Sequence, residues 1–395
     1  MDFDHIVIGS GLAALGAALG TSERQRVLVI GNPLAGRFLY YDERGTVPCA
    51  FTGAGGLGND WHGVIPMALR NNFGGASSEG FTKLLSYFYA GIDFHERVQS
   101  PSLFVPWKAI RPQKEFPRLT LRRPHLTIIN ESVTRIKVLG QRVEVLTESQ
   151  TFRGAKVWVA AGTLHTPGLL ERSFGKTFAR GLVSDHCFSY IGQASDLPAP
   201  RLTHTAKGIF FPAAYTEKAE ALYTLRPARF AFRQLDYGIE QRAVFGLPTG
   251  NAVAKIAKRA SPGLLTEAFF NRFGLFPSSP MHSVYAQVLV RDAYDFGSKE
   301  RLVRARPVTI RAATNLAREH QPFGGITQSK LLDAFIPGIH LHHSIDRDLL
   351  QAVEIDCPGS PVHIVDASTL QNIGPDHHSF KMMLSAHDRV VESLL

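Results

Sequence analysis

The sequence predicts an α/β fold in which a Rossmann-type, dinucleotide-binding domain carries an inserted domain built on an antiparallel sheet. Three observations predict it. A strand pattern, a glycine turn, a helix pattern and a second strand pattern follow one another between residues 4 and 30. A buried strand pattern returns near the C-terminus, at 362–370. Between them, residues 195–335 are rich in phenylalanine and arginine and include the alternating stretch 283–294, which is typical of a half-buried strand.

The N-terminal unit begins with an apolar run at 4–9, typical of a buried parallel strand, followed at once by GSGLAA. In the pattern G-x-G-x-x-A the first glycine permits a tight turn and the second lets backbone approach a pyrophosphate. The small third residue lets the helix pack on the strand, and the N–H groups at the helix start favour phosphate. The three positions are Gly9, Gly11 and Ala14.

The second strand of this unit ends without the acid that usually binds a ribose. Asn32 stands near that place, and its side-chain amide can still hydrogen-bond a ribose hydroxyl. Because Asn32 is neutral, NADP stays open as a ligand, with Arg37 as a phosphate partner.

A second glycine-rich segment occupies 52–67. It holds too many glycines for a helix or a regular strand, which favours backbone that lies close to a ligand. A surface loop is the alternative, but Trp61 and His62 are costly to leave on a loose loop. The glycines that lead to Trp61 are Gly53, Gly55, Gly56 and Gly58.

Strand patterns and a helix start follow in the middle of the chain. Gly140 and Gln141 mark a hairpin turn, and a helix is expected from Thr166-Pro167, with proline at its first position. The turn before that helix is a second place where backbone N–H groups could face a cofactor. The strand patterns lie at 126–130, 133–140, 142–149 and 155–162.

The last helix is expected from about Ser379, because apolar side chains from Phe380 to Leu394 recur on one helical face. Asp376, or less favourably Ser379, can cap it.

Composition excludes several classes of protein. Only 19% of the 395 residues are charged, the net charge is +9, and the chain is neither disordered nor coiled-coil in composition. Three separated cysteines offer no disulfide framework, and an acidic N-terminus lacks an export signal, so we expect a cytoplasmic protein with no transmembrane segment. The basic stretches carry no nucleic-acid-binding motif, so a nucleic-acid partner is not expected.

Four segments in the same order resemble the glucose–methanol–choline (GMC) oxidoreductases, FAD enzymes that oxidise alcohols. They are GSGLAA, GAGGLGNDWHG, AAGTLHTPGLLERSFG and VDASTLQNIGPDHHSFKMMLSAHDRV. The resemblance brackets the chain and identifies it as a short, divergent member. It implies an FAD-binding Rossmann-type (GMC-like) domain with an inserted antiparallel-sheet substrate domain, and FAD as the cofactor.

The resemblance also implies roles for single residues. Gly9, Gly11 and Ala14 would hold the pyrophosphate, and Ser379 would begin a helix that faces the flavin. A covalent flavin link through His62 stays open, although Asp60 stands at the matching position. The other implied cofactor-binding residues are Asn32, Gly56, Asn59, Trp61, Ala161, Gly162, Asp366 and Ala367.

Two histidine groups match the family's catalytic segments. His340 with Ser344 fits a pattern His-x-x-x-Ser, with His342 as the substitute; His378 fits best before the last helix, with His377 one position away. Imidazole suits general-base work because its pKa lies near neutrality. Metal binding by His340, His342 and His343 is a rival reading, but adjacent residues on a strand point to opposite faces, so no metal is expected.

These observations predict an FAD-dependent oxidoreductase that oxidises a hydroxyl group of an alcohol or sugar-like substrate, with histidine-assisted proton removal. A GMC-like flavoprotein with non-oxidative chemistry (elimination, isomerisation or decarboxylation) and a non-catalytic FAD-binding partner subunit stay open as alternatives. The short chain favours a bulky, glycan-like hydroxylated substrate, and the electron acceptor is unknown. The expected domain pieces are FAD-binding at 1–75, 126–194 and 336–395, connecting at 76–125, and substrate-binding at 195–335.

Overall fold

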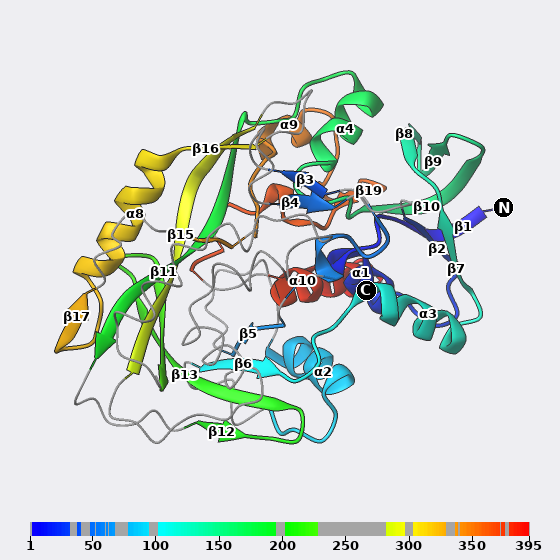
Figure 1. Ribbon diagram of the computed structural model, residues 1–395. Coiled ribbons are helices and arrows are strands. Elements are labelled where there is room, and N and C mark those ends of the chain that lie inside the picture. Colours follow the sequence, from blue (N-terminus) through cyan, green and yellow to red (C-terminus); the bar gives the residue numbers. More distant parts are fainter. Residues whose placement is uncertain are drawn as a thin grey trace.

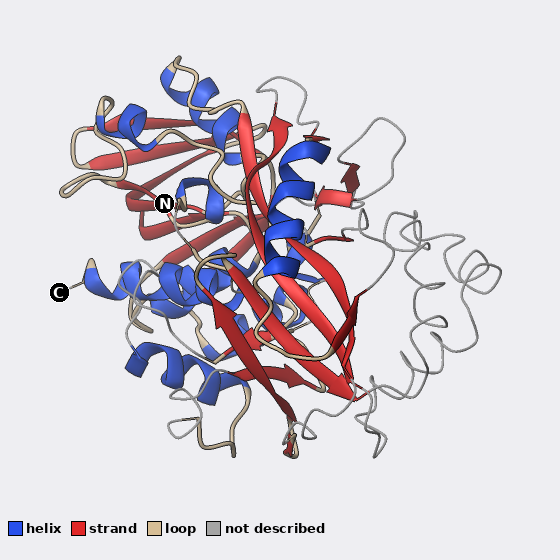
Figure 2. Ribbon diagram, turned by 90° about the vertical axis from the view of Figure 1, so that its left-hand side faces the viewer, coloured by secondary structure: helices blue, strands red, loops and turns tan. Residues whose placement is uncertain are grey.

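The computed structural model consists of two sheets, one largely parallel and one antiparallel, each with helices packed on it (Figures 1 and 2). Figure 1 shows the strands of the first sheet on the right and the long strands β11 and β15 of the second on the left. The structure describes residues 2–31, 38–40, 48–51, 53–59, 61, 63–67, 78–94, 102–194, 202–227, 282–296, 303–328, 336–338, 340–371, 373–375 and 379–394.

The first sheet has seven strands in the order β7-β2-β1-β10-β9-β8, with β19 also paired to β10. β1, β2, β7, β10 and β19 are parallel, whereas β8 and β9 form an antiparallel extension. The strands are β1 (Asp2–Ile8), β2 (Val27–Gly31), β7 (Leu126–Asn130), β8 (Val133–Leu139), β9 (Arg142–Thr147), β10 (Thr151–Val159) and β19 (Val362–Ile364).

Both faces of this parallel core are buried, as the apolar runs predict. Alternation sends Val7 to one face, against α1, α2, α3 and α10, and sends Ile6 and Ile8 to the other, against α4 and α9. The helices are α1 (Leu12–Gly20), α2 (Ser78–Phe88), α3 (Pro112–Arg122), α4 (Thr166–Phe174), α9 (Arg347–Gln351) and α10 (Ser379–Glu392).

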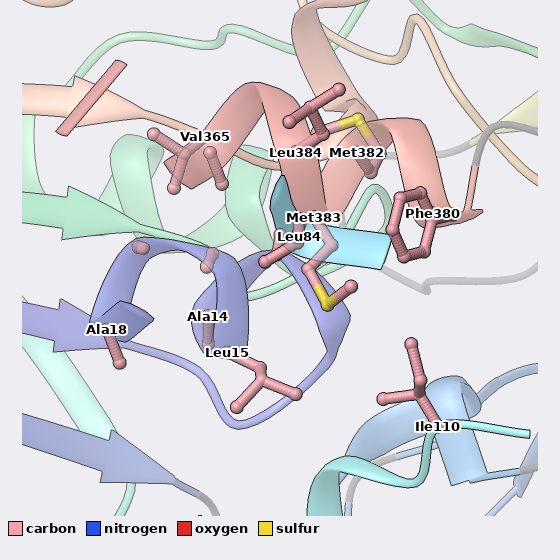
Figure 3. Packing of buried hydrophobic residues seen from close by; sticks show 14 of the residues in the cluster. Ala14, Leu15, Ala18, Leu84, Ile110, Val365, Phe380, Met382, Met383 and Leu384 are labelled. Atoms are coloured by element: carbon pink, nitrogen blue, oxygen red, sulfur yellow. The ribbon is translucent and has the colours of Figure 1, made fainter. Parts of the chain in front are cut away.

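The first and last helices of the chain pack directly against each other (Figure 3). A Cβ added at Gly16 would overlap the carbonyl oxygen of Met383, and one added at Gly20 would lie 2.5 Å from that of His387. Positions increase together along both helices, so α1 and α10 run in the same direction. Their N-termini, at Leu12 and Ser379, are therefore neighbours.

The second sheet has ten strands in the order β17-β11-β15-β14-β13-β6-β5, with β12, β16 and β18 paired beside this path. Helix α8 (Pro307–Glu319) covers one face, where Ile310 packs near Cys187 and Ala317 packs near Val288. The strands are β5 (Ile65–Pro66), β6 (Ser102–Pro106), β11 (Leu182–Ala194), β12 (Thr203–His204), β13 (Gly208–Thr216), β14 (Ala221–Pro227), β15 (His282–Phe296), β16 (Val303–Ala305), β17 (Ile326–Gln328) and β18 (Ile336–Pro337).

Two details differ from the expected elements. The expected strand at 362–370 ends at Ile364, because Asp366 instead caps the short 3-10 helix η3 (Ala367–Thr369). The stretch 283–294 does form a strand, but its residues 286–290 are buried on both faces rather than one. The remaining elements are β3 (Phe38–Tyr40), β4 (Pro48–Phe51) and the 3-10 helix η1 (Gly56–Asn59).

The expected domain division stays a prediction. Within the expected FAD-binding piece 126–194, β11 pairs in the ten-stranded sheet rather than in the seven-stranded one, and so do β5 and β6 from earlier in the chain. In the described part of the chain, no helix is both long enough and apolar enough to span a membrane.

Candidate functional site

The candidate site lies where the parallel strands end. Gly9 N–H donates to Ile30 O at 2.8 Å after β1, and Ala160 N–H donates to Ile8 O at 2.7 Å after β10. Val365 N–H donates to Val159 O at 2.9 Å after β19. Since carboxyl ends of parallel strands meet at one edge of a sheet, three loops far apart in the sequence begin side by side, in the usual place for ligands of open α/β sheets.

The glycine turn and the second glycine-rich segment face each other at this edge. Gly55 N–H donates to Ser10 Oγ at 3.0 Å. A Cβ added at Gly56 would lie 3.9 Å from Gly11 Cα, an ordinary van der Waals distance, so the two segments approach each other closely here. Gly9 has a φ of 121°, and a Cβ there would overlap Ala160 O, which is why only glycine fits the turn.

Asn59 and Trp61 are held in place on the second glycine-rich segment. Asn59 Nδ2 donates to Ala54 O at 2.7 Å, and Arg111 Nη1 donates to Trp61 O. The Trp61 indole is 6% exposed, and its Nε1–H has no hydrogen-bond partner within the described part of the chain. A buried N–H donor of this kind fits an acceptor group supplied by a ligand.

The predicted second signature forms a turn that Asp366 holds. Asp366 accepts hydrogen bonds from Gly162 N–H at 2.9 Å, Thr166 Oγ1–H at 2.5 Å and Ser368 N–H at 2.9 Å. Burial raises the pKa of Asp366, and these hydrogen bonds oppose that rise. Both of its oxygens are therefore used within the protein, and Ala161 and Ala367 lie on the two loops that Asp366 joins.

The histidine segment 340–344 is joined to the same loops. Thr163 Oγ1 donates to Leu341 O at 2.6 Å, and Ser344 Oγ donates to Thr163 O at 2.6 Å. His343 N–H also donates to Ala367 O at 2.9 Å. Five segments from the two ends and the middle of the chain thus meet at one sheet edge.

The structure distinguishes His340 from His342. His342 is 1% exposed, and its Nδ1 lies 3.0 Å from His340 O, so this nitrogen carries the proton and donates. Burial, with a further contribution from His186, lowers the pKa of His342 well below its usual value. His340 is only half-buried, and Asp185 Oδ1 accepts from its backbone N–H at 2.8 Å. His340 is therefore the member of this pair that can meet a substrate.

His186 is a member of the site that sequence reasoning missed. Its ring centroid lies 5.4 Å from that of His342 and 6.0 Å from that of His340, and its Nε2 donates to Gly374 O at 2.8 Å. The neighbouring Asp185 accepts from Tyr294 Oη at 2.8 Å. The signal in the sequence that could have found it is the adjacent polar pair Asp185-His186.

Cys187 and His343, which lie near these histidines in the sequence or the sheet, have surroundings of their own. Burial raises the pKa of Cys187 well above its usual value, so its thiol is not a ready nucleophile. His343 points away from His342 toward Arg180, whose Nη1 lies 2.9 Å from His343 Nδ1. Among the described residues, no group of three or more histidine, cysteine, aspartate or glutamate side chains could hold a metal ion.

Several predicted residues fall outside the described residues. Ser379 is described and begins α10 beside the start of α1, within the group of loops at the sheet edge. The predicted residues outside the described ranges are Asn32, His62, His377 and His378, together with Arg37, Asp60 and Asp376.

Two solved structures share this architecture over almost their whole length. Pyridoxine 4-oxidase from Mesorbium loti matches with a TM-score of 0.53 and 13% identity, covering 99% of each chain. An FAD-dependent oxidoreductase from Chaetomium thermophilum matches with a TM-score of 0.52 and 13% identity, again covering 99% of each chain. The chain shares the fold of these oxidoreductases. No family model and no curated protein sequence matches it.

These matches confirm the predicted GMC-like α/β fold. The two neighbours named above are an oxidase and an FAD-dependent oxidoreductase, the class and the cofactor that the sequence predicts. Because both are only 13% identical to this chain, the roles of single residues stay predictions.

Proposed function

We propose that this protein is an FAD-dependent oxidoreductase that oxidises a hydroxyl group of an alcohol or sugar-like substrate. The observation that carries the proposal is the meeting of the glycine turn, the facing glycine-rich segment and the histidine segment at one edge of the parallel sheet. A phosphate-binding backbone and a candidate base then adjoin one site. Pyridoxine 4-oxidase and an FAD-dependent oxidoreductase have the same fold, which supports this reading.

The residues present fit FAD. The glycine turn at 9–11 and the glycines at 55 and 56 bring two stretches of backbone to one place, and α1 and α10 begin side by side next to it. Helix N-termini favour the negative charge of phosphate groups. The buried indole N–H of Trp61 supplies a donor for which the described residues offer no acceptor. Gly9, Gly11 and Ala14 would hold the pyrophosphate, and Gly56, Asn59 and Trp61 would lie beside the flavin.

Asp366 acts on this site indirectly. Because its carboxylate oxygens accept from Gly162, Thr166 and Ser368, it shapes the loop after β10 rather than offering free oxygens to a ligand. Ala161 and Gly162 would then face the adenosine side through their backbone. Gly162 has a φ of 91°, and a Cβ there would meet no atom within 4 Å, so the turn leaves space beside it.

His340 would remove the hydroxyl proton of the substrate. Bound FAD supplies a hydride acceptor, and oxidation of an alcohol also requires loss of the hydroxyl proton. Asp185 fixes the backbone of His340, and Tyr294 fixes Asp185 from the other side. His342 stays neutral, because burial lowers its pKa. Its Nδ1–H donates to the carbonyl oxygen of His340 and so helps to hold His340 in place. His378, or His377, would be the second member of the acid–base pair.

The start of α10 would complete the charge balance. A helix N-terminus carries a partial positive charge, so Ser379 N–H and Phe380 N–H would favour negative charge that develops beside them. Phe380 is fully buried against Phe81 of α2, with ring centroids 5.4 Å apart, and this contact holds the helix start in place.

The test is anaerobic reduction of the flavin. The purified protein should carry or take up FAD, and at least one alcohol, sugar or polyol should bleach its flavin absorbance with formation of the aldehyde or ketone. A protein that cannot take up FAD would overturn the proposal. Product formation without an electron acceptor would instead indicate elimination, isomerisation or decarboxylation.

A further inference from the structure

Gln287 is a buried amide at the centre of the ten-stranded sheet. It lies on β15, paired in register with Phe188 of β11 and Leu222 of β14. It is 3% exposed, and neither its Oε1 nor its Nε2 has a hydrogen-bond partner in the part of the chain that the structure describes. Buried side-chain amides are nearly always paired, because an unpaired one loses its bonds to water without replacement. Since none of the described residues pairs with it, the amide of Gln287 is available to a group supplied by a bound molecule.

The side chain faces the candidate site rather than α8. Cys187 and Val288 are direct partners in the sheet and belong to the clusters that α8 covers. Their neighbours Gln287 and His186 alternate to the opposite face. His186 pairs with Leu289, two positions from Gln287, so Gln287 and His186 are diagonal neighbours on one face, about 7–8 Å apart.

The same face meets the chain that leads to the last helix. His186 Nε2 donates to Gly374 O at 2.8 Å, and Arg291 Nη1, also on β15, donates to Gln371 O at 3.3 Å. The segment 371–374 precedes the predicted catalytic pair His377 and His378 in the sequence. Gln287 thus lies on the face of the antiparallel sheet that carries His186 and adjoins His340.

From this placement we infer that Gln287 is a specificity-determining residue, which hydrogen-bonds a second polar group of the substrate. The inference rests on the proposed function and names a property of its substrate. A carboxamide offers two donors and an acceptor and carries no charge, so it suits a hydroxyl or carbonyl group. Its neighbours Phe188, Leu222 and Leu289 are apolar, so the matching substrate is an alcohol with an apolar body and one further polar group.

The test compares benzyl alcohol with 2-, 3- and 4-hydroxybenzyl alcohol as reductants of the flavin, in the wild-type protein and in Gln287→Met. Methionine keeps the length of the side chain and removes both polar atoms. In the wild type, at least one hydroxybenzyl alcohol should have a KM lower than that of benzyl alcohol, by about 5- to 150-fold for one buried hydrogen bond. In Gln287→Met this ratio should fall to about 1, with kcat for benzyl alcohol retained.

A second measurement separates this role from a structural one. Without substrate, Gln287→Met should unfold at a Tm about 2 °C or more above that of the wild type, because it removes an unpaired buried amide. The same change at the exposed Gln113 of α3 serves as the control and should not shift the Tm. A lower Tm for Gln287→Met would mean that the amide supports the fold, and would overturn the inference.

The outcomes also separate the inference from the proposed function. If alcohols reduce the wild-type flavin and the ratio of KM values survives in Gln287→Met, only the specificity role fails. If no alcohol reduces the wild-type flavin, the proposed function fails and takes the specificity role with it.

Discussion

The two halves of the candidate site differ in the atoms that form their surfaces. One is a backbone half and the other a side-chain half. On the edge of the seven-stranded sheet the surfaces are backbone: Gly9, Gly11, Gly55 and Gly56 bring main chain together with little side chain between. On the face of the ten-stranded sheet that carries His186 and Gln287, the surface consists of side chains, and we call this the side-chain half of the site. Backbone groups are the same for every amino acid, so a backbone surface suits a group that many ligands share. A side-chain surface can differ from protein to protein through single substitutions. The first side therefore suits a common cofactor and the second a particular substrate.

The largest expected effect tests the side-chain half. Replacing His340 by alanine removes the proposed base, and kcat for flavin reduction should fall by about 10²- to 10⁴-fold. FAD content should not change, because the backbone half holds the cofactor. Alanine at the exposed His204 of β12 is the control and should leave kcat unaltered. Full activity in His340→Ala would show that His340 is not the base.

The next prediction concerns the packing of α1 on α10, which supports the backbone half of the site. Gly16→Ala would drive a Cβ into the carbonyl of Met383 and separate the N-termini of α1 and α10. We expect the free energy of unfolding to fall by about 3 kcal/mol, measured by urea denaturation, and FAD affinity to fall with it.

Gly168 is a matched control, and its replacement by alanine should change the free energy of unfolding in the opposite direction. In α4, a Cβ at Gly168 would meet only the end of the Arg172 side chain, at 3.4 Å. Gly168→Ala should therefore raise the free energy of unfolding by about 0.5–1 kcal/mol, as a glycine-to-alanine change does in an open helix position. Equal effects at Gly16 and Gly168 would contradict the close packing of α1 on α10.

A smaller effect comes from a histidine inside the seven-stranded sheet. Trp158 Nε1 donates to His5 Nδ1 at 3.0 Å, and burial, with Lys156 nearby, lowers the pKa of His5 to about 4. The unfolded chain binds a proton below about pH 6.5 and the folded one does not, so stability is present above pH 6.5 and is lost as the pH falls toward 4. From pH 7 to pH 5 the wild type should lose about 2 kcal/mol more than His5→Asn. Parallel pH profiles in urea denaturation would argue against a buried neutral His5.

A further, modest effect tests the side-chain half again. Tyr294→Phe removes the hydroxyl that donates to Asp185, and should lower the free energy of unfolding by about 1.5 kcal/mol. Because Asp185 also holds His340, kcat should fall several-fold while FAD content stays the same. A fall in stability alone, with kcat intact, would reduce Tyr294 to a structural residue.

The backbone half could be predicted from the sequence, because its signals are local. A strand followed at once by Gly9-Ser10-Gly11 defines the turn. Pro167 was expected at the first helical position and lies at the second position of α4, so it still marks the helix start. The side-chain half could be predicted only in part. His340 was predicted through its family-like segment, but His186 and Gln287 look ordinary in the sequence. The alternation at 283–294 even suggested one wet face, whereas Gln287 is buried.

The sequence by itself determined the turns, the periodicity of strands and helices, and the residue types available for chemistry, since each depends on neighbours within a few positions. Only the tertiary structure decided which of them meet. The parallel course of α1 and α10, the bond from Thr163 to Leu341, and the register that puts Gln287 beside His186 all join residues about a hundred or more positions apart. Such pairings depend on how two sheets and their helices bury their apolar faces together, and no local pattern carries that information.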